Sequence, residues 1–561
     1  MSDNRGLDSS KRVNRRRLLE LGAFTVGATI VSACTPPSVS APTAAPAAKP
    51  TEAPKAAEAP KPTEAPKPAE ATKPAAAAAP TNTPAAAAAP TATTAAAATK
   101  PAEATKPAVA AAPQTGATTK QPVEIVFNTW WQPLQDAFVV LTKEFQDQNP
   151  GVTIKTQFGG DDYTTKMEAG IVAGGFGDAA TGDNGVQTKY MSAGHHYDLS
   201  AWVQSDGINL KEHYALGGIE IWCGKVLQMP MDNDDRAVYY NKTMLKAAGA
   251  PDPWDDLKGK WTLDDMLEIA KKVTKKDASG RITQYGLQIE YTDTEDQEPY
   301  IWSVGGNYAD WETGKYNYLN PGLVKWVELV HKWATQDKIV ITKEAIAAMQ
   351  GKATANPFRG GIVAMYHRAS YDSTINEKEI GNKFEWDAAP SPGPGSFNTA
   401  LPTGVAGSTV NPNFVPKIAK NPEWGYKWIA YLAGDRAETL YAQKKTMMVA
   451  NKAAWKTYQD SPPPKHSGSF VYYAFSRPYG YHYYSDIMNE VMYDTVQPEL
   501  DKAFLGQQTP KEALEKAQKK IDTLGKSQSA SCPSPYTIGG SPLPAMTEAE
   551  LNKWGVKPYT A

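Results

Sequence analysis

The sequence predicts an α/β fold, and two observations support that prediction. From residue 122 onward, segments with strand-like alternation are followed by segments with helical apolar spacing, an order typical of a sheet covered by helices. Phe24 is the single aromatic residue before residue 122. A segment so poor in aromatic residues cannot bury enough apolar surface to offset the entropy of ordering it. We therefore expect a folded region of about 440 residues, large enough for two lobes.

The first elements of this region predict a parallel sheet. Val123–Phe127 alternates and is β-branched, which indicates a strand. Asp136–Asn149 carries apolar residues at helical spacing and ends in an Asn-Pro-Gly turn. Val152–Thr156 is the next predicted strand. Because consecutive parallel strands need a crossover helix, this β-α-β order predicts parallel pairing with helices on the sheet faces.

The remaining elements continue the alternation. Thr262, followed three residues later by Asp265, predicts the capped start of a helix that runs through Val273. Leu323–Trp333 is strongly amphipathic and predicts another helix. The other predicted helices are Tyr163–Gly174, Glu423–Leu432 and Pro510–Leu524, and the other predicted strands are Val226–Pro230, Ala237–Tyr240 and Gly361–Tyr366.

The charge distribution excludes several classes of protein. The formal charge is −2 for the whole chain, but it is +3 for residues 1–33, +3 for residues 35–121 and −8 for residues 122–561. A folded region this acidic is a poor candidate for coating nucleic acid, which requires clustered Lys and Arg. Because no run of 18 apolar residues occurs, we expect neither a transmembrane helix nor a channel or permease.

Residues 1–33 have the pattern of an export signal. Basic residues precede an apolar run that is too short to span a bilayer and that ends in small residues. Arg15 and Arg16 give the start of this segment the look of a twin-arginine signal, although Asn14 and Glu20 depart from that pattern and leave general secretion open. Val31-Ser32-Ala33-Cys34 resembles a bacterial lipobox, which implies acylation of Cys34; the alternative is an ordinary signal peptide with a chance cysteine.

Residues 34–121 predict a disordered tether behind this anchor. The segment is rich in Pro, Ala and Thr, and frequent Pro forbids a continuous helix. We expect the folded region to be held by the lipid anchor outside the membrane, in the periplasm or at the cell surface. The two remaining cysteines, Cys223 and Cys532, are chemically able to form a disulfide after export, and two free buried thiols are the alternative.

The order of short motifs in the folded region resembles the extracellular solute-binding proteins of ABC importers, specifically the sugar-binding family that includes maltodextrin-binding protein. Each motif alone is weak, but together they span residues 123 to about 525 in the family's order. They are Asn149-Pro150-Gly151-Val152, Gly174-Gly175-Phe176-Gly177-Asp178, Met229-Pro230-Met231, Tyr239-Tyr240-Asn241-Lys242, Trp261-Thr262, Glu298-Pro299-Tyr300-Ile301-Trp302, Gly361-Ile362-Val363-Ala364-Met365 and Thr509-Pro510-Lys511-Glu512-Ala513-Leu514.

The resemblance implies a two-lobed periplasmic-binding-protein-like fold of type II, over residues 122–530, with a C-terminal tail at 531–561. The first lobe would contain about 122–233 and 404–455, and the second about 234–390 and 456–530. Crossings between the lobes would lie near Asp232–Arg236, Ser391–Thr403 and Asn451–Lys456. The implied function is a monomeric, cofactor-free receptor that binds a sugar between its lobes and delivers it to an ABC permease with a cytoplasmic ATPase.

Sugars are held by stacked aromatic rings and by polar side chains, which directs attention to such residues near strand ends. Trp130 and Trp131 directly follow the first strand, where an open α/β sheet places its ligand crevice. Two adjacent residues of an extended segment point in opposite directions, so we expect one of them to reach the ligand and the other to pack. The clustered acids include Asp232 and Asp235, for which a solvated turn with one or two ligand-facing carboxylates is favoured over a calcium loop.

The other candidate ligand-binding residues follow from the resemblance. Glu298, Tyr300 and Trp302 would alternate along an extended segment and share one face. The resemblance implies further ligand contacts by Asp183, Asn184, Tyr366, Arg368, Tyr371, Tyr481 and Tyr483, with Arg477 as a weaker candidate. The alternative for Asp183 and Asn184 is a simple turn. The alternative for Tyr481 and Tyr483 is a packed aromatic cluster.

Other chemistries find little support in the sequence. It contains no H-E-x-x-H metal motif, no phosphate-binding G-x-x-x-x-G-K-[ST] loop and no G-x-S-x-G nucleophile motif. We therefore expect neither a metal, a cofactor nor catalytic residues. Because a glycosidase needs only two suitably spaced carboxylates, a surface-anchored carbohydrate-active enzyme remains an alternative, as does a binding protein that serves as a sensor without transport.

Overall fold

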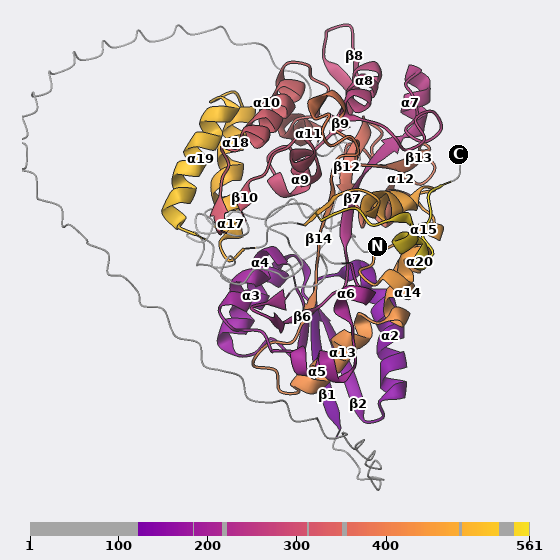
Figure 1. Ribbon diagram of the computed structural model, residues 1–561. Helices are drawn as coiled ribbons and strands as arrows, with labels where there is room; N and C mark the ends of the chain where they lie inside the picture. The colour runs from indigo at the N-terminus through magenta and orange to yellow at the C-terminus, as the bar shows by residue number, and fades with distance from the viewer. Residues whose placement is uncertain are drawn as a thin grey trace, which may run out of the picture. The chain divides into compact units, whose positions relative to one another are not determined.

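The computed structural model describes residues 122–182, 184–215, 221–310, 313–349, 356–481, 485–526 and 543–559. These residues belong to one compact unit that contains two main sheets with helices on their faces (Figure 1). The predicted signal and tether, residues 1–121, lie outside the described ranges.

The first sheet has the strand order β2-β1-β3-β15-β6. Strand β1 pairs in parallel with β2 and with β3, which confirms the predicted β-α-β start. The sheet strands are β1 Val123–Thr129, β2 Val152–Phe158, β3 Ala179–Thr181, β6 Gln228–Met229 and β15 Asn413–Phe414. The helices of this lobe are α2 Gln135–Gln148, α3 Tyr163–Ala173, α4 Asn184–Ser192, α5 Ser200–Ser205, α6 Leu210–His213, α13 Pro422–Leu432 and α14 Asp435–Lys444.

The second sheet has the order β16-β14-β7-β12-β9-β8, and β13 also pairs with β7. Its strands are β7 Asp234–Asn241, β8 Lys275–Lys276, β9 Ile282–Gln288, β12 Val363–Ala369, β13 Trp386–Pro390, β14 Ala406–Thr409 and β16 Tyr479–Tyr481. The helices of this lobe are α7 Lys242–Ala248, α8 Leu263–Val273, α9 Thr294–Ser303, α10 Pro321–Thr335, α11 Lys343–Met349, α12 Asp372–Ile380, α17 Met488–Val491, α18 Gln497–Phe504 and α19 Pro510–Leu524. Two short hairpins, β4 Ile221–Trp222 with β5 Lys225–Val226 and β10 Ala309–Asp310 with β11 Lys315–Tyr316, complete the strands.

Local sequence signals explain where two helices of the second lobe begin. The Thr262 hydroxyl accepts a hydrogen bond from the Asp265 backbone N–H, and the Asp265 carboxylate accepts one from the Thr262 N–H, so the predicted cap of α8 is confirmed. Thr509 and Glu512 form the same reciprocal pair at the start of α19. Each pair satisfies backbone donors that a helix terminus would otherwise leave without partners.

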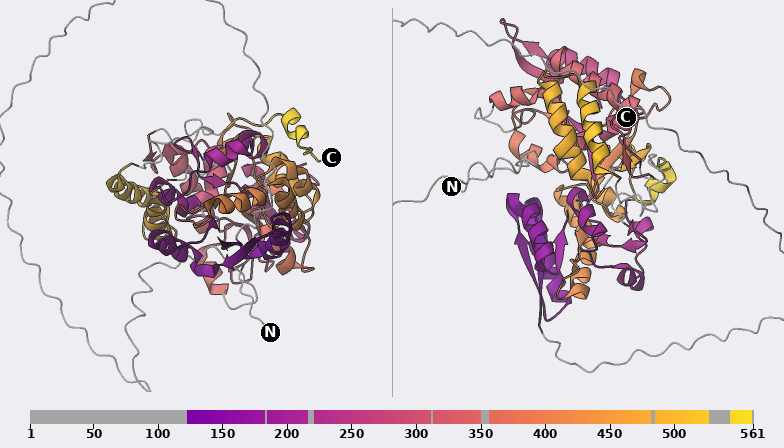
Figure 2. Two further views of the ribbon diagram at one scale, coloured as in Figure 1. Left: turned by 90° about the horizontal axis from the view of Figure 1, so that it is seen from below. Right: turned by 90° about the vertical axis from the view of Figure 1, so that its left-hand side faces the viewer.

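The chain passes between the sheets in segments that we call the hinge segments. Residues 230–233 connect β6 to β7, and residues 410–412 connect β14 to β15. A third approach is made by Val449, which forms a bridge with Asp232. Figure 2 shows the consequence from two further directions: orange elements late in the sequence lie among the purple elements of the first lobe.

One predicted crossing is wrong. Residues 391–403 were expected to cross between the lobes and residue 404 to begin a return to the first lobe. Strand β14 instead pairs with β16 and with β7 in the second sheet, so the chain crosses only after Thr409. The backbone pairing of β14 with β7 keeps this segment in the second lobe because each ladder bond satisfies a buried backbone group.

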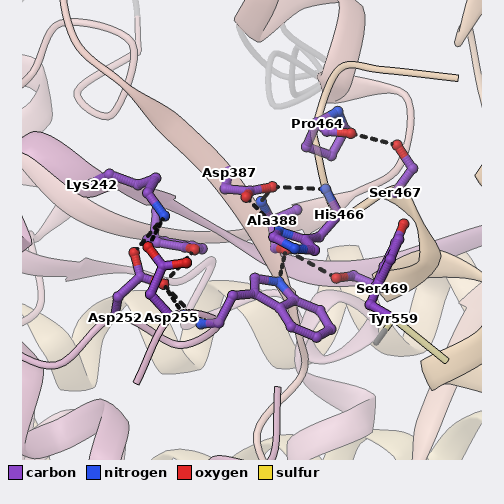
Figure 3. A network of polar contacts seen from close by, with 12 residues as sticks. Lys242, Asp252, Asp255, Asp387, Ala388, Pro464, His466, Ser467, Ser469 and Tyr559 are labelled. Atoms are coloured by element: carbon purple, nitrogen blue, oxygen red, sulfur yellow. Dashed lines mark hydrogen bonds and ion pairs between the residues drawn. The ribbon is translucent and has the colours of Figure 1, made fainter. Parts of the chain in front are cut away.

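Part of the predicted C-terminal tail packs on the folded body. Leu543 exchanges two backbone hydrogen bonds with Tyr479, of 2.9 and 2.7 Å, and so extends the edge of the second sheet. Helix α20, Glu548–Lys553, follows, and Leu551 is fully buried. The Tyr559 ring lies edge-on to His466, with 4.9 Å between ring centroids (Figure 3). Two further short helices precede this tail in the sequence, α15 Trp455–Asp460 and α16 Tyr472–Phe475.

The polar network around His466 ties the second sheet to the segment that carries α15 and α16. The His466 ring contacts the Asp387 carboxylate through Nδ1, at 2.6 Å, and stacks on Trp254 at 4.3 Å between centroids. Trp254 in turn donates its indole N–H to the Ala388 carbonyl oxygen (Figure 3).

Candidate functional site

Aromatic side chains from both lobes meet near the hinge segments. Trp131, directly after β1, is 3% exposed, and its ring meets Tyr371 edge-on at 6.0 Å between centroids. Tyr371 follows β12 of the second sheet, so the contact joins two predicted ligand-binding residues across the lobes. Trp130 is half-buried and lies 4.3 Å from Trp131, centroid to centroid. Within the described residues, the indole N–H groups of Trp130 and Trp131 have no hydrogen-bond partner.

A buried ion cluster fixes the position of Tyr371. Arg368 donates from Nη2 to the Tyr371 hydroxyl oxygen over 2.7 Å and also pairs with the Asp296 carboxylate. Arg236 donates from Nε to the other oxygen of Asp296 over 2.8 Å. Burial alone would raise the pKa of Asp296, but Arg368 and Arg236 lower that pKa to about 2. Asp296 is therefore an anion, and the two arginines share its single negative charge.

The clustered acids at the start of β7 do not form a solvated turn. Asp232 is fully buried and accepts hydrogen bonds from the backbone N–H and the side-chain amide of Asn411, at 2.5 and 2.8 Å. This pair ties one hinge segment to the other. Burial, with the nearby Asp234, raises the pKa of Asp232 well above its ordinary value. The prediction of a solvent-exposed turn is thus wrong, because β7 is buried along its whole length.

The next two acids connect β7 to other strands. Asp234 accepts a hydrogen bond of 2.7 Å from the Ser370 hydroxyl, and burial raises its pKa to about 6. Asp235 accepts hydrogen bonds from the Asn233 amide, at 3.0 Å, and from the Tyr479 hydroxyl. Burial raises the pKa of Asp235 well above its ordinary value, although these two hydrogen bonds oppose the shift. Both carboxyl groups hold the hinge together rather than facing solvent.

The segment that contains Glu298, Tyr300 and Trp302 was expected to be extended, and this prediction is wrong. It forms helix α9, which polar and acidic residues at its start favour. On a helix, residues 298 and 302 lie near one face and residue 300 does not. Glu298 is buried and accepts a hydrogen bond from Tyr308, and Tyr300 is buried and stacks on Trp326. Only Trp302 of the three is half-exposed.

Tyr366 also lies in a core rather than at the aromatic contact. Its ring is 4% exposed and packs between Tyr239, at 6.4 Å, and Phe358, at 5.8 Å. Strand β12 is buried from Val363 to His367, which leaves no solvent-facing side for Tyr366. Arg477, the weaker candidate, is half-buried and donates to the Ser391 carbonyl oxygen over 2.7 Å.

Four candidate residues are not tested by the structure. Asp183 and Tyr483 lie outside the described residues. Asn184 begins α4 and Tyr481 ends β16, but their side chains are outside the described part of the chain. All four stay predictions.

The sequence reasoning missed a group of amides at the strand ends of the first sheet. Gln187 accepts a hydrogen bond from the Gln228 amide, and both side chains are buried. Asn413 receives a hydrogen bond of 2.9 Å from the Thr181 hydroxyl. Gln187 Nε2, Gln228 Oε1 and Asn413 Nδ2 have no partner within the described residues. Gln228 carried a signal, since it is a polar residue inside a short apolar strand next to Pro230.

The described residues contain no group of three His, Cys, Asp or Glu side chains placed to hold a metal ion. The clustered acids 232–235 are instead distributed among separate hydrogen-bond partners. Cys223, in the turn between β4 and β5, is disulfide-bonded. Cys34 and Cys532 both lie outside the described residues, so the pairing of Cys223 with Cys532 stays a prediction.

Two α/β lobes joined by hinge segments, with aromatic side chains of both lobes in contact beside them, define the class of two-lobed periplasmic-binding-protein-like folds. Solved structures of this class are similar to the chain. An ABC substrate-binding protein of Listeria monocytogenes in complex with cycloalternan is 20% identical and has a TM-score of 0.62. The similarity covers 72% of this chain and 100% of that one. The maltodextrin-binding domain of Bdellovibrio bacteriovorus bound to maltotriose is 17% identical, with a TM-score of 0.57 and coverages of 72% of this chain and 99% of that one.

Sequence comparison gives the family. A Brucella abortus protein named as a binding protein is 24% identical over 323 residues, which are 56% of this chain and 72% of that protein. The family model for bacterial extracellular solute-binding proteins matches residues 127–439. The chain therefore belongs to the bacterial extracellular solute-binding protein family, and the predicted family and two-lobed fold are confirmed. Members of this family and the structural neighbours are binding proteins.

Proposed function

We propose that this protein is the receptor of an ABC importer and that it captures an oligosaccharide between its lobes outside the membrane. The observation that supports this most directly is the contact between Trp131 of the first lobe and Tyr371 of the second. Aromatic rings pack against the apolar faces of sugars, so rings from both lobes give a sugar the means to hold the lobes together. Binding then selects the closed state by a hinge transition.

The electrostatics of the junction favour a neutral ligand. Arg236 and Arg368 already share the Asp296 carboxylate, which balances one of their two positive charges within the protein. A phosphate or carboxylate ligand would have to compete with a buried carboxylate for these donors. Solved neighbours that are bound to cycloalternan, maltotriose and mannotriose support the same ligand class.

We infer that no bond is made or broken in this capture and that transport energy comes from the ATPase of the permease. Family membership supports this interpretation over a carbohydrate-active enzyme. Incubation of the protein with maltotriose, followed by chromatography of the products, separates the two. Intact trisaccharide is expected, and shorter products would identify an enzyme.

The remaining parts of the proposal concern location. Residues 1–33 act as the export signal, acylated Cys34 as the anchor, and residues 34–121 as the tether of a monomeric receptor. Within the described ranges, none of the helices combines the length and apolarity needed to cross a bilayer. Intact-mass measurement of the exported protein tests the anchor: an acylated Cys34 is expected at the new N-terminus, and the Cys34→Ala variant is expected to lose membrane association.

The experiment that tests ligand class is a thermal-shift screen of the full chain with maltotriose, mannotriose, cycloalternan, polyols and sugar phosphates. We expect stabilisation by one or more neutral oligosaccharides, with at least tenfold weaker binding by the Trp131→Ala and Tyr371→Ala variants. Trp424→Ala is the matched control, because Trp424 is half-buried on α13 and its ring contacts Lys427 instead of the second lobe. Stabilisation by phosphates alone would contradict the proposal.

A further inference from the structure

Trp302 differs from Trp254 and Trp261, two other tryptophans of the second lobe. Trp254 and Trp261 are buried and donate their indole N–H groups to backbone carbonyl oxygens, each over 2.7 Å. Trp302 is half-buried near the C-terminal end of α9. Its indole N–H is not a buried donor without a partner. Within the described residues, no other aromatic ring packs on the Trp302 ring. The indole therefore keeps a polar edge and ring surface that a ligand can use.

The ring of Trp302 lies against two glycines that face each other on adjacent strands. Gly407 of β14 and Gly480 of β16 are register partners. An added Cβ at Gly480 would lie 2.5 Å from Cε3 of Trp302, and one at Gly407 would lie 2.5 Å from Cζ3. Neither glycine has a positive φ. Backbone conformation therefore permits other residues at both positions, and the position of the indole is what excludes them.

The two strands beneath the indole are themselves fixed to the hinge. Strand β14 pairs with β7 through Ser408 and Asp235, and residues 410–412 then cross to the first sheet. Strand β16 is held from its other edge by the backbone pair between Tyr479 and Leu543. At the other end of α9, Asp296 pairs with Arg236 of β7. Helix α9 thus contacts β14 and β16 near its C-terminal end and β7 near its N-terminal end.

We propose that the Gly407–Gly480 pair is a positioning element for ligand binding. It places the Trp302 ring on β14, the strand that leads into the hinge segment 410–412, so that the ring and this connection between the lobes move as one unit. This inference rests on the proposed function, because it assigns a residue pair to the same oligosaccharide site. Gly407 and Gly480 act through Trp302 and do not themselves need to touch the ligand.

The main test is a double-mutant cycle in the full chain. Gly480→Ala moves the indole without requiring a new backbone conformation, so we expect oligosaccharide binding at least tenfold weaker by calorimetry. Trp302→Ala is expected to weaken binding as much or more. In the Trp302→Ala background, Gly480→Ala is expected to change affinity less than twofold, because the ring it displaces is gone.

Gly175→Ala is the matched control, since Gly175 has no positive φ and an added Cβ there meets nothing within 4 Å. It is expected to leave affinity unchanged. Equal losses from Gly480→Ala with and without Trp302 would overturn the proposal, and so would an affinity of Gly480→Ala equal to that of the unmodified chain. Gly407→Ala is a less suitable variant, because its Cβ would also meet the Gly480 carbonyl oxygen at 2.9 Å.

A second measurement keeps the inference separate from the proposed function. In 5-fluorotryptophan-labelled protein, the Trp302 resonance is identified by its loss in Trp302→Phe. Gly480→Ala is expected to shift that resonance and to leave the other tryptophan resonances in place, whereas an unchanged Trp302 resonance would contradict the glycine contact. If the indole shifts but no oligosaccharide binds the unmodified chain, the proposed function fails, and with it the ligand-positioning role of the pair.

Discussion

Asp296 and Asp234 are both buried beside the hinge strands, yet their surroundings act on them in opposite directions. Asp296 lies between Arg236 and Arg368, which lower its pKa to about 2 against the effect of burial. Asp234 accepts a hydrogen bond from the Ser370 hydroxyl, and burial raises its pKa to about 6 although Ser370 and the more distant charges of Arg236 and Arg368 lower it. Asp232 and Asp235 follow Asp234 in this respect. Burial therefore does not set the charge of a junction carboxyl group; its partner does.

This difference separates two structural roles. The Asp296 anion holds two cations and places Tyr371 through Arg368. The other acids have raised pKa values and are held by hydrogen bonds from neutral groups. Asp232 binds Asn411 of the neighbouring hinge segment, whereas Asp234 binds Ser370 after β12 and Asp235 binds Tyr479 of β16. One cluster is an ion network that depends on charge, and the other is a hydrogen-bond set that works best when charge is low.

The largest expected effect comes from breaking the ion network. Asp296→Asn keeps the side-chain size but leaves Arg236 and Arg368 buried without an anion, so we expect unfolding free energy to fall by about 3–5 kcal/mol. Urea unfolding measures this change. Asp494→Asn, at an exposed position, is the control and is expected to stay within about 0.5 kcal/mol. A loss of similar size in both variants would remove the contrast between Asp296 and an ordinary acid.

The pH dependence tests the opposite behaviour of Asp234. Its folded-state pKa is about 6, above its ordinary value of 3.8, so the folded state binds the proton more tightly. The stability from this group is complete below pH 4 and is lost as pH rises through 6, a change of about 3 kcal/mol. Asp234→Asn should remove this decline. Parallel curves of unfolding free energy against pH for the two proteins, measured from pH 4 to 7, would contradict the assignment.

Lys445 extends the comparison to a buried cation. Its ammonium contacts the Tyr458 carbonyl oxygen and lies 3.5 Å from the Tyr458 ring centroid, and burial pushes its pKa well below the ordinary value. Because the folded state favours the neutral amine, the charge is a cost at pH 7 that shrinks as pH rises towards 10. Lys445→Met is expected to raise unfolding free energy by about 1–3 kcal/mol.

The matched control for this substitution is Lys444→Met, because Lys444 is exposed on the preceding residue of α14. Differential scanning calorimetry at pH 7 should show a higher Tm for Lys445→Met and little change for Lys444→Met. A lower Tm for Lys445→Met would mean that the buried ammonium stabilises the fold.

The smallest effect on unfolding free energy is expected from an ion pair that has good geometry but is exposed to solvent. Arg436 pairs with Glu144 through two hydrogen bonds, of 3.0 and 2.6 Å. Solvent screens this pair, so Arg436→Gln should change unfolding free energy by less than about 1 kcal/mol in urea. A loss as large as that of Asp296→Asn would show that burial of the partners does not decide the strength of these pairs.

Much of the fold could be predicted because its signals are local. Alternation and helical spacing in residues 123–156 gave β1, α2 and β2, and the Thr262 cap gave the start of α8. The crossing expected at 391–403 failed because no local pattern reports which sheet β14 joins. That choice depends on pairing with β7, more than 160 residues earlier in the chain.

The candidate site likewise contains residues that the sequence predicted and residues that it did not. Trp131 was predicted from its place after the first strand, and Arg368 and Tyr371 from the family resemblance. The structure brings the three side chains together. Asp296, Asn411 and Tyr479 were missed because their importance arises only from partners distant in sequence. Glu298 and Tyr300 were misplaced because the residues that resemble a family strand form a helix here.

The return of the chain through residues 410–412 has a consequence for how the protein is made. Thr181 of β3 pairs with Asn413 of β15, which lies 232 positions later in the sequence. During synthesis, the β3 edge of the first sheet therefore stays unpaired until most of the second lobe has been made. Such a late, long-range pairing is slow to form and leaves an unpaired strand accessible to other chains in the meantime. The first lobe opens the folded part of the chain, yet it is completed only after much of the second.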